Sequence, residues 1–187
     1  NDKKFLENQE NFMKSIKKEI ESFGFEINDR SDGYCTQLGL TEHLGKRVST
    51  YSKGMKRKLS LLIVIMMGRD ILLMDEPTSG VDPISRVEIR SLIEALKADG
   101  KTVIITTDMY LTESVISKLL CDNGFSGYEK LFVSCEYGCG KADGGLYRII
   151  KNEYGGKRIV HMGDNYMSDV LTAGKAGFEA VYYRRKA

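Results

Sequence analysis

The sequence holds few residues that could bind zinc or cross-link the chain, with four cysteines and two histidines among 187 residues. Cys135 and Cys139 have a C-x3-C spacing, but no second pair supplies the other ligands of a structural zinc site. We therefore expect free thiols in or near the core, with no metal or disulfide role. A zinc finger and a disulfide scaffold are both disfavoured.

Long hydrophobic runs and an excess of one charge are also absent. The longest apolar stretch, LSLLIVIMMG (59–68), is too short to cross a bilayer. The 28 basic and 26 acidic residues give a formal net charge of +2, which argues against a nucleic-acid surface. The first residues, NDKKFLENQENF, lack a secretory signal pattern. We expect a cytoplasmic protein that neither spans a membrane nor binds nucleic acid.

The first third of the chain predicts mainly helices. Residues 3–23 carry apolar side chains at helical spacing, whereas 24–37 hold turn-forming residues and predict a loop or short irregular strand. A short helix, a turn and a long helix capped by Ser52 should follow, with Gly68 ending the long helix. The basic cluster KGMKRK (53–58) is expected to be a solvated face of that helix.

Beyond residue 68, apolar strands alternate with amphipathic helices. The predicted strands contain ILLMD (71–75), VIITT (103–107), LFVS (131–134), IVHMGD (159–164) and AVYY (180–183). This alternation predicts an α/β fold: a three-layer, Rossmann-like, mainly parallel five-stranded sheet with helices on both faces. We expect an N-terminal helical segment over 1–67 and an α/β domain over 68–187.

Three motifs follow one another between residues 38 and 107: LGLTEHLGKRVSTYSKGMKRKLSL, ILLMDEP and TSGVDP. They resemble the signature region, Walker B strand and D-loop of an ABC transporter ATP-binding domain. The resemblance implies that Asp75 holds magnesium and that Glu76 orients or deprotonates the attacking water. It also implies a membrane permease or a second ATP-binding subunit as partner. The nucleotide-binding residues that it implies are Ser52, Lys53, Gly54 and Asp82.

Two parts of the ABC pattern are missing from these 187 residues. No G-x-x-x-x-G-K-[ST] phosphate-binding loop occurs, and YGCGKADGG has Ala142 where the hydroxyl residue should stand. Asp108 occupies the position of the family's switch histidine. ATP binding is therefore doubtful, and ATP hydrolysis is not expected.

From about residue 106 the chain contains TTDMYLTESVISKLL, LFVSCEYGCGKADGGLYRIIKNE and VHMGDNYMSDVLTAGKAGFEAVYY. These segments resemble a haloacid dehalogenase-like (HAD-like) hydrolase of the group found with bacterial glycosyltransferases. The resemblance implies that Lys141 neutralises a substrate phosphate and that Thr107, or its neighbour Thr106, hydrogen-bonds a phosphate oxygen. Asp164 and Asp169 would hold Mg²⁺, a hard cation that prefers oxygen ligands.

The first HAD motif, D-x-D-x-[TV], does not occur upstream, and its nearest analogue is ILLMDEP (71–77). If the strands follow the HAD order, AVYY, IVHMGD, ILLMD, VIITT and LFVS lie in sequence across the sheet. Asp75 then occupies the nucleophile position, beside Thr107 and Asp164, and joins Asp164 and Asp169 as a metal ligand. Pro77 replaces the second acid, so acid catalysis lacks its usual group.

The chain therefore reads as a composite of two hydrolase-derived segments. In the first hypothesis, a truncated ABC-type ATP-binding segment is fused to a HAD-like segment and does not hydrolyse ATP. In the second, the chain is a Mg²⁺-dependent HAD-like phosphohydrolase with Asp75 in the nucleophile position. In the third, it is an inactive folded scaffold.

Overall fold

The computed structural model describes residues 31–43, 50–77 and 83–182. Its elements are α2 (Ser31–Gln37), η1 (Thr41–His43), α3 (Lys53–Met66), β1 (Ile71–Asp75), α4 (Pro83–Ala98), β2 (Thr102–Thr107), α5 (Glu113–Asp122), β3 (Lys130–Val133), α6 (Ser134–Tyr137), α7 (Gly145–Glu153), β4 (Ile159–Gly163), the π-helix η3 (Tyr166–Thr172), α8 (Ala173–Lys175) and β5 (Glu179–Tyr182). The helix predicted over 3–23 lies outside the described residues.

The strands form one sheet in the order β3-β2-β1-β4-β5, and every neighbouring pair is parallel. The central strand β1 aligns Asp75 with Thr106 of β2, and Met74 with Met162 of β4. This is the strand order predicted from the HAD resemblance. The α/β class with a parallel five-stranded sheet is confirmed.

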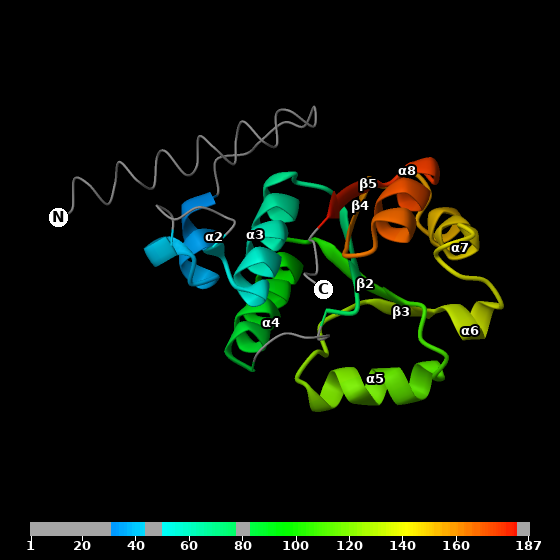
Figure 1. Cartoon of the computed structure of the whole chain (residues 1–187), viewed down its shortest axis with the longest axis horizontal. Coiled ribbons are helices and arrows are strands. Elements are labelled where there is room, and N and C mark those ends of the chain that lie inside the picture. Colours follow the sequence, from blue (N-terminus) through cyan, green and yellow to red (C-terminus); the bar gives the residue numbers. More distant parts are fainter. Residues whose placement is uncertain (1–30, 44–49, 78–82, 183–187) are drawn as a thin grey trace.

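Helices cover both faces of the sheet, because alternate strand residues point to opposite sides. Leu72 and Met74 of β1 lie in a hydrophobic cluster with residues of α3, α4 and α5. Ile71 and Leu73 lie in a second cluster, with residues of α7 and α8. Figure 1 shows α3 and α4 on one side of the strands and α7 and α8 on the other. The three layers predicted from the sequence are present.

The long helix α3 has the predicted ends. The Ser52 hydroxyl accepts a hydrogen bond of 3.1 Å from the backbone N–H of Met55. Gly68, just after the helix, has a φ of 62°, a conformation that suits glycine. Leu61, Leu62 and the rest of the buried face pack in the same cluster as the sheet. Within the described residues, the expected boundary at 67/68 therefore does not separate two cores.

Two predictions for the N-terminal part were wrong. Residues 31–37 form the helix α2, because Tyr34, Cys35 and Leu38 share one helical face that packs on the cluster of α3. The basic cluster is not a solvated helix face, since Arg57 is 2% and Lys58 7% exposed. Long basic side chains can bury their aliphatic stems, which composition alone does not reveal.

Two limits set by composition are met in the described part of the chain. All four cysteines are free, although only Cys35 is buried, and Cys121 and Cys135 lie exposed rather than near the core. No helix among the described residues is long and apolar enough to cross a membrane.

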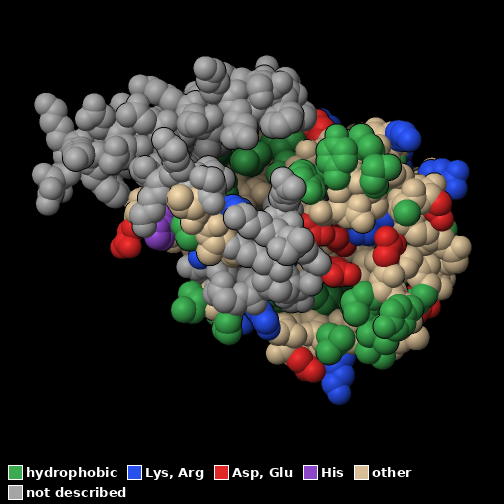
Figure 2. All heavy atoms as spheres, in the orientation of Figure 1, with side chains coloured by type: hydrophobic (Ala, Val, Ile, Leu, Met, Phe, Trp, Pro, Cys, Tyr) green, Lys and Arg blue, Asp and Glu red, His purple; other side chains and the backbone are tan. Residues whose placement is uncertain are grey.

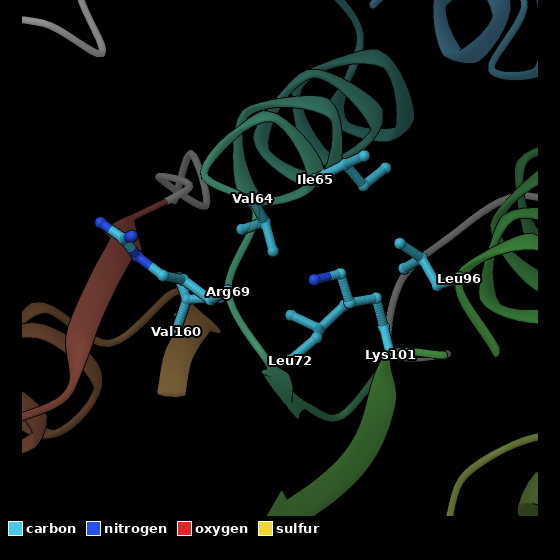
Figure 3. A pocket seen from close by; sticks show the side chains of 7 residues that line it. All are labelled: Val64, Ile65, Arg69, Leu72, Leu96, Lys101 and Val160. Atoms are coloured by element: carbon cyan, nitrogen blue, oxygen red, sulfur yellow. The ribbon is translucent and has the colours of Figure 1, made fainter. Parts of the chain in front are cut away.

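The end of the sheet where β1 and β2 begin holds a small pocket, shown in Figure 3. Its volume of about 20 Å³ is enough for about one water molecule. Two basic side chains line it: Lys101 donates to the carbonyl of Gly68, and Arg69 pairs with Glu179. The predicted site residues Asp75 and Asp164 lie at the opposite end, where the strands finish.

Removing the cap of α3 should destabilise the fold. Ser52→Ala leaves the N–H of Met55 without its side-chain acceptor, so the free energy of unfolding should fall by about 1 kcal/mol. Urea denaturation measures this change. Ser52→Asn is the matched control, because asparagine caps helices well and should retain most of the stability. An equal loss in both variants would show that capping is not the contribution of Ser52.

Candidate functional site

Three carboxylates meet at the carboxyl edge of the sheet. Asp75 ends β1, Asp164 follows β4, and Asp169 lies in η3; one oxygen from each lies within 4.8 Å of the others. Asp75 and Asp169 are 5% and 1% exposed, whereas Asp164 is half-buried. Figure 2 shows acidic side chains gathered in the middle of the visible face, beside a basic one. The structure thus brings together all three predicted metal ligands.

Lys141 lies between two of these carboxylates. Its ammonium group is 2.7 Å from Oδ1 of Asp75 and 3.0 Å from Oδ1 of Asp169. The lysine precedes α7, in a segment held in place where the backbone N–H of Lys141 donates to Oδ1 of Asp108. With 4% of the residue exposed, Lys141 is a buried cation that pairs with two buried anions. The structure thus places Lys141 beside two of the predicted site residues.

The Asp169 carboxylate is held by several donors at once. Its Oδ1 accepts from Lys141, from the hydroxyl of Ser168 at 3.0 Å and from that of Tyr147 at 3.4 Å. Its Oδ2 accepts from the backbone N–H of Asn165 at 2.9 Å. These bonds fix the side chain, so Asp169 holds the ammonium of Lys141 in place.

Two residues of β4 make room for Asp169 and support it. A Cβ on Gly163 would lie 2.3 Å from Oδ2 of Asp169, so only glycine fits at the end of this strand. His161, fully buried, places Nε2 3.3 Å from Oδ1 of Asp169 and 3.2 Å from the hydroxyl of Tyr147. Burial lowers the pKa of His161 and favours the neutral ring.

The three buried charges have different proton affinities. Burial raises the pKa of Asp75 to about 6; the charge of Lys141 opposes the rise and that of Asp169 adds to it. Burial also disfavours ionised Asp169, yet the hydrogen bond with His161 and the charge of Lys141 hold its pKa below the usual range. Burial works against the Lys141 cation, but both carboxylates raise its pKa. Three carboxylates and one ammonium thus meet among the described side chains, and carboxylate oxygens are ligands that suit a divalent cation.

The threonine chosen from the sequence lies on the wrong face of the sheet. The Thr107 hydroxyl donates to Oε1 of Glu76 at 3.1 Å and accepts from the backbone N–H of Met109 at 3.1 Å. Thr106, its neighbour, aligns with Asp75 and is fully buried. Its hydroxyl has no hydrogen-bond partner within the described part of the chain. Strand alternation makes Thr106, not Thr107, the phosphate-facing candidate.

Glu76 also lies away from the carboxylate cluster. Together with Thr107 it lines a cavity between β2 and α5 whose other walls are mostly apolar. This agrees with the expectation that Asp75 and Glu76, as successive residues, point to opposite sides of the sheet.

The predicted nucleotide-binding residues are only partly described. Ser52 caps α3, and Gly54 is buried in the first turn of this helix. The side chain of Lys53 and the whole of Asp82 lie outside the described residues. A nucleotide-binding role for these four residues stays a prediction.

Several groups that support the site were not found from the sequence. They are Asp108, Tyr147, His161, Asn165 and Ser168. Asn165 had a usable signal, since it stands before a helix and its side chain accepts from the N–H groups of Met167 and Ser168. A lone tyrosine or histidine inside an apolar helix or strand carries no such signal, because only folding brings it to its partner.

Comparison with known proteins finds similarity in the first part of the chain. Residues 1–79 match the family model described as ABC transporter. A macrolide export ATP-binding/permease protein of Rhodopseudomonas palustris is 39% identical over 82 residues, 44% of this chain and 12% of that protein. A linearmycin resistance ATP-binding protein of Bacillus subtilis is 37% identical over 97 residues, 52% of this chain and 30% of that protein. The chain thus spans less than a third of either relative. The family match also includes residues 1–37, which motif reading left unassigned.

Comparison of structures describes the fold. An uncharacterized protein from Corynebacterium glutamicum superposes with a TM-score of 0.53 at 22% identity, over 63% of this chain and 87% of that one. A dehalogenase structure has a TM-score of 0.48 at 16% identity, over 80% of this chain and 61% of that one. The first likeness supports the α/β fold alone, and the second is too distant to carry an argument about chemistry.

The pKa of Asp75 predicts how the free energy of unfolding depends on pH when a chelator keeps the protein free of metal. Its pKa is raised from 3.8 to about 6, so the ionised carboxylate is less favourable in the folded chain than in the unfolded one. The free energy of unfolding should therefore fall as pH rises through this interval, by up to about 3 kcal/mol. Asp75→Asn has no carboxylate to ionise, so its free energy of unfolding should fall by about 2 kcal/mol less than that of wild type over the same interval.

Denaturation at several pH values measures this difference, and Asp122→Asn on exposed α5 is the control that should change little. An equal fall in stability with pH in Asp75→Asn and wild type would contradict the prediction.

Proposed function

We propose that this chain, whose residues 1–79 are similar to ABC transporter ATP-binding proteins, is a composite in which an ABC-type segment completes a HAD-like α/β unit. Its carboxylate cluster is a Mg²⁺-dependent site for phosphate esters, with weak turnover. The observation that carries the proposal is the buried Lys141, placed between Asp75 and Asp169 where Asp164 also arrives.

The donor set fits Mg²⁺. Oxygens of Asp75, Asp164 and Asp169 lie close enough to act on one cation, and carboxylates are the ligands that Mg²⁺ prefers. The cation would offset the excess negative charge and polarise a phosphate oxygen. Because Asp169 already accepts hydrogen bonds on both oxygens, Asp75 and Asp164 are the principal candidates for direct contact.

The same residues can receive a phosphate group. The ammonium of Lys141 would pair with phosphate oxygens, and the buried hydroxyl of Thr106 would donate to one of them. A carboxylate oxygen of Asp75 can then form a bond to phosphorus while the ester oxygen leaves with the bond electrons. The leaving oxygen needs a proton, and Pro77 stands where the usual acid would be, so this step should be slow.

Three observations support the absence of ATP hydrolysis by these 187 residues. The sequence contains no phosphate-binding loop. Glu76 is hydrogen-bonded to Thr107 beside an apolar cavity, away from the carboxylate cluster. Asp108, at the switch-histidine position, accepts from the backbone N–H of Lys141.

The similarity of residues 1–79 supports a cytoplasmic location and a membrane permease or second ATP-binding subunit as partner. A signature segment acts on nucleotide held by a phosphate-binding loop, which such a subunit would have to supply.

Mg²⁺ should stabilise the folded chain through the carboxylate cluster. At a Mg²⁺ concentration about a hundredfold above Kd, the free energy of unfolding should rise by about 2.7 kcal/mol. Each kcal/mol of added stability raises Tm by about 2 to 4 °C. Asp164→Asn should lose most of the shift, whereas Glu76→Gln, next to Asp75 but on the other face, should keep it. Thermal denaturation with and without Mg²⁺ measures both variants. No shift in wild type would refute the site and leave the scaffold hypothesis.

Cleavage of a generic aryl phosphate should be slow or undetectable, because the leaving oxygen receives no proton from the residue at position 77. A colorimetric assay with Mg²⁺ tests wild type beside Asp164→Asn. Fast cleavage that Asp164→Asn abolishes would contradict the slow step.

ATP should be hydrolysed no faster by wild type than by Glu76→Gln, because no phosphate-binding loop is present. Release of inorganic phosphate from Mg-ATP measures both proteins. A wild-type turnover of about one per second, near the low end of ordinary enzymes, that the variant loses would show that an ATPase site exists.

A further inference from the structure

The helix α3 contacts the candidate site through one buried side chain. Arg57, in the basic cluster of this helix, is 2% exposed. Its Nη2 donates to the carbonyl oxygen of Asp75 at 3.0 Å and to that of Glu76 at 2.7 Å. A guanidinium from the ABC-type segment therefore binds the backbone that carries the central carboxylate of the site.

The bound backbone lies where the pairing of β1 in the sheet ends. Pairing with β4 ends at Met74, and pairing with β2 ends at Asp75, which aligns with Thr106. Glu76 has a φ of 41°, in the left-handed region that a residue with a side chain rarely adopts. Its own N–H is 3.5 Å from the carbonyl of Thr106, a long hydrogen bond. The turn after Asp75 is therefore strained, and Arg57 binds two of its carbonyl oxygens.

We propose that Arg57 is a positioning residue that sets where the Asp75 carboxylate lies relative to Asp164, Asp169 and Lys141. This inference rests on the proposed function of the site. Arg57 acts through the two carbonyl oxygens, which hold the end of β1 and the strained turn in one arrangement. Without these bonds the turn can relax toward a common conformation, and the Asp75 carboxylate moves with it.

Arginine suits this task better than lysine. One Nη2 atom carries two hydrogens, so it can donate to both carbonyls from a planar group whose direction is set by the rest of the guanidinium. A lysine keeps the charge, but its side chain is shorter and ends in a compact ammonium group instead of a planar guanidinium. Arg57→Lys therefore separates the charge at this position from the geometry of the two bonds.

The first test measures Mg²⁺ affinity by titration calorimetry well below Tm. Loss of a supporting partner around a metal site typically weakens affinity about 10- to 100-fold, and we expect a loss of about tenfold in Arg57→Lys and more in Arg57→Met. Lys56→Met, which removes a neighbouring half-buried cation of α3, is the matched control and should bind as wild type does. Unchanged Kd in folded Arg57 variants, even with a lower Tm, would overturn the proposal.

The second test needs no metal and separates this inference from the proposed function. In buffer with chelator, the free energy of unfolding is measured for Asp75→Asn and Arg57→Lys, alone and combined. If Arg57 sets the position of the Asp75 carboxylate, the effect of Asp75→Asn should change by roughly half or more in the Arg57→Lys background. Additive effects would overturn the inference, whereas wild type without a Mg²⁺ response would overturn only the proposed function. If Arg57→Met does not fold, the conservative Arg57→Lys carries both tests.

Discussion

A buried lysine between two buried carboxylates is the interaction on which the carboxyl edge of the sheet depends. An isolated ammonium with 4% exposure would be costly, so Lys141 requires Asp75 and Asp169 as partners, and they require it. The pairing draws together β1, the turn before α7 and the π-helix η3. Asp164 brings a third carboxylate to the same place. Repulsion between the carboxylates disfavours the cluster, and a divalent cation bound between them would offset this repulsion.

The central strand β1 serves the two faces of the sheet in different ways. Asp75 points toward α7 and the carboxylate cluster, whereas Glu76 lines the cavity beside α5. A single strand end thus cannot offer both acidic residues to one site. The ABC-type hypothesis places Glu76 at the reaction centre, whereas the HAD-like hypothesis places Asp75 there. The position of Lys141 beside Asp75 favours the second.

Much of the fold could be predicted from the sequence, because continuous apolar runs and helix spacing are local properties. The five strands, their order, the Ser52 cap and the end of α3 at Gly68 were all predicted correctly. The helix α2 was missed because its polar residues resemble a turn, and the packing of Cys35 and Leu38 in the cluster of α3 helps to stabilise it. The sequence could not decide between Thr106 and Thr107, because a strand motif does not state which of two neighbours faces the carboxylate cluster.

The sequence by itself determined the chemical groups at this edge: three aspartates, a lysine and a threonine pair at the ends of predicted strands and turns. Their types and spacing along the chain are enough to indicate a cation and a phosphate. Only the tertiary structure decided which groups meet. Arg57 contacts the carbonyl oxygens of Asp75 and Glu76, and His161 contacts Asp169, because packing and strand register bring distant residues together. Such contacts depend on the distance between elements after folding, and no local pattern encodes that distance.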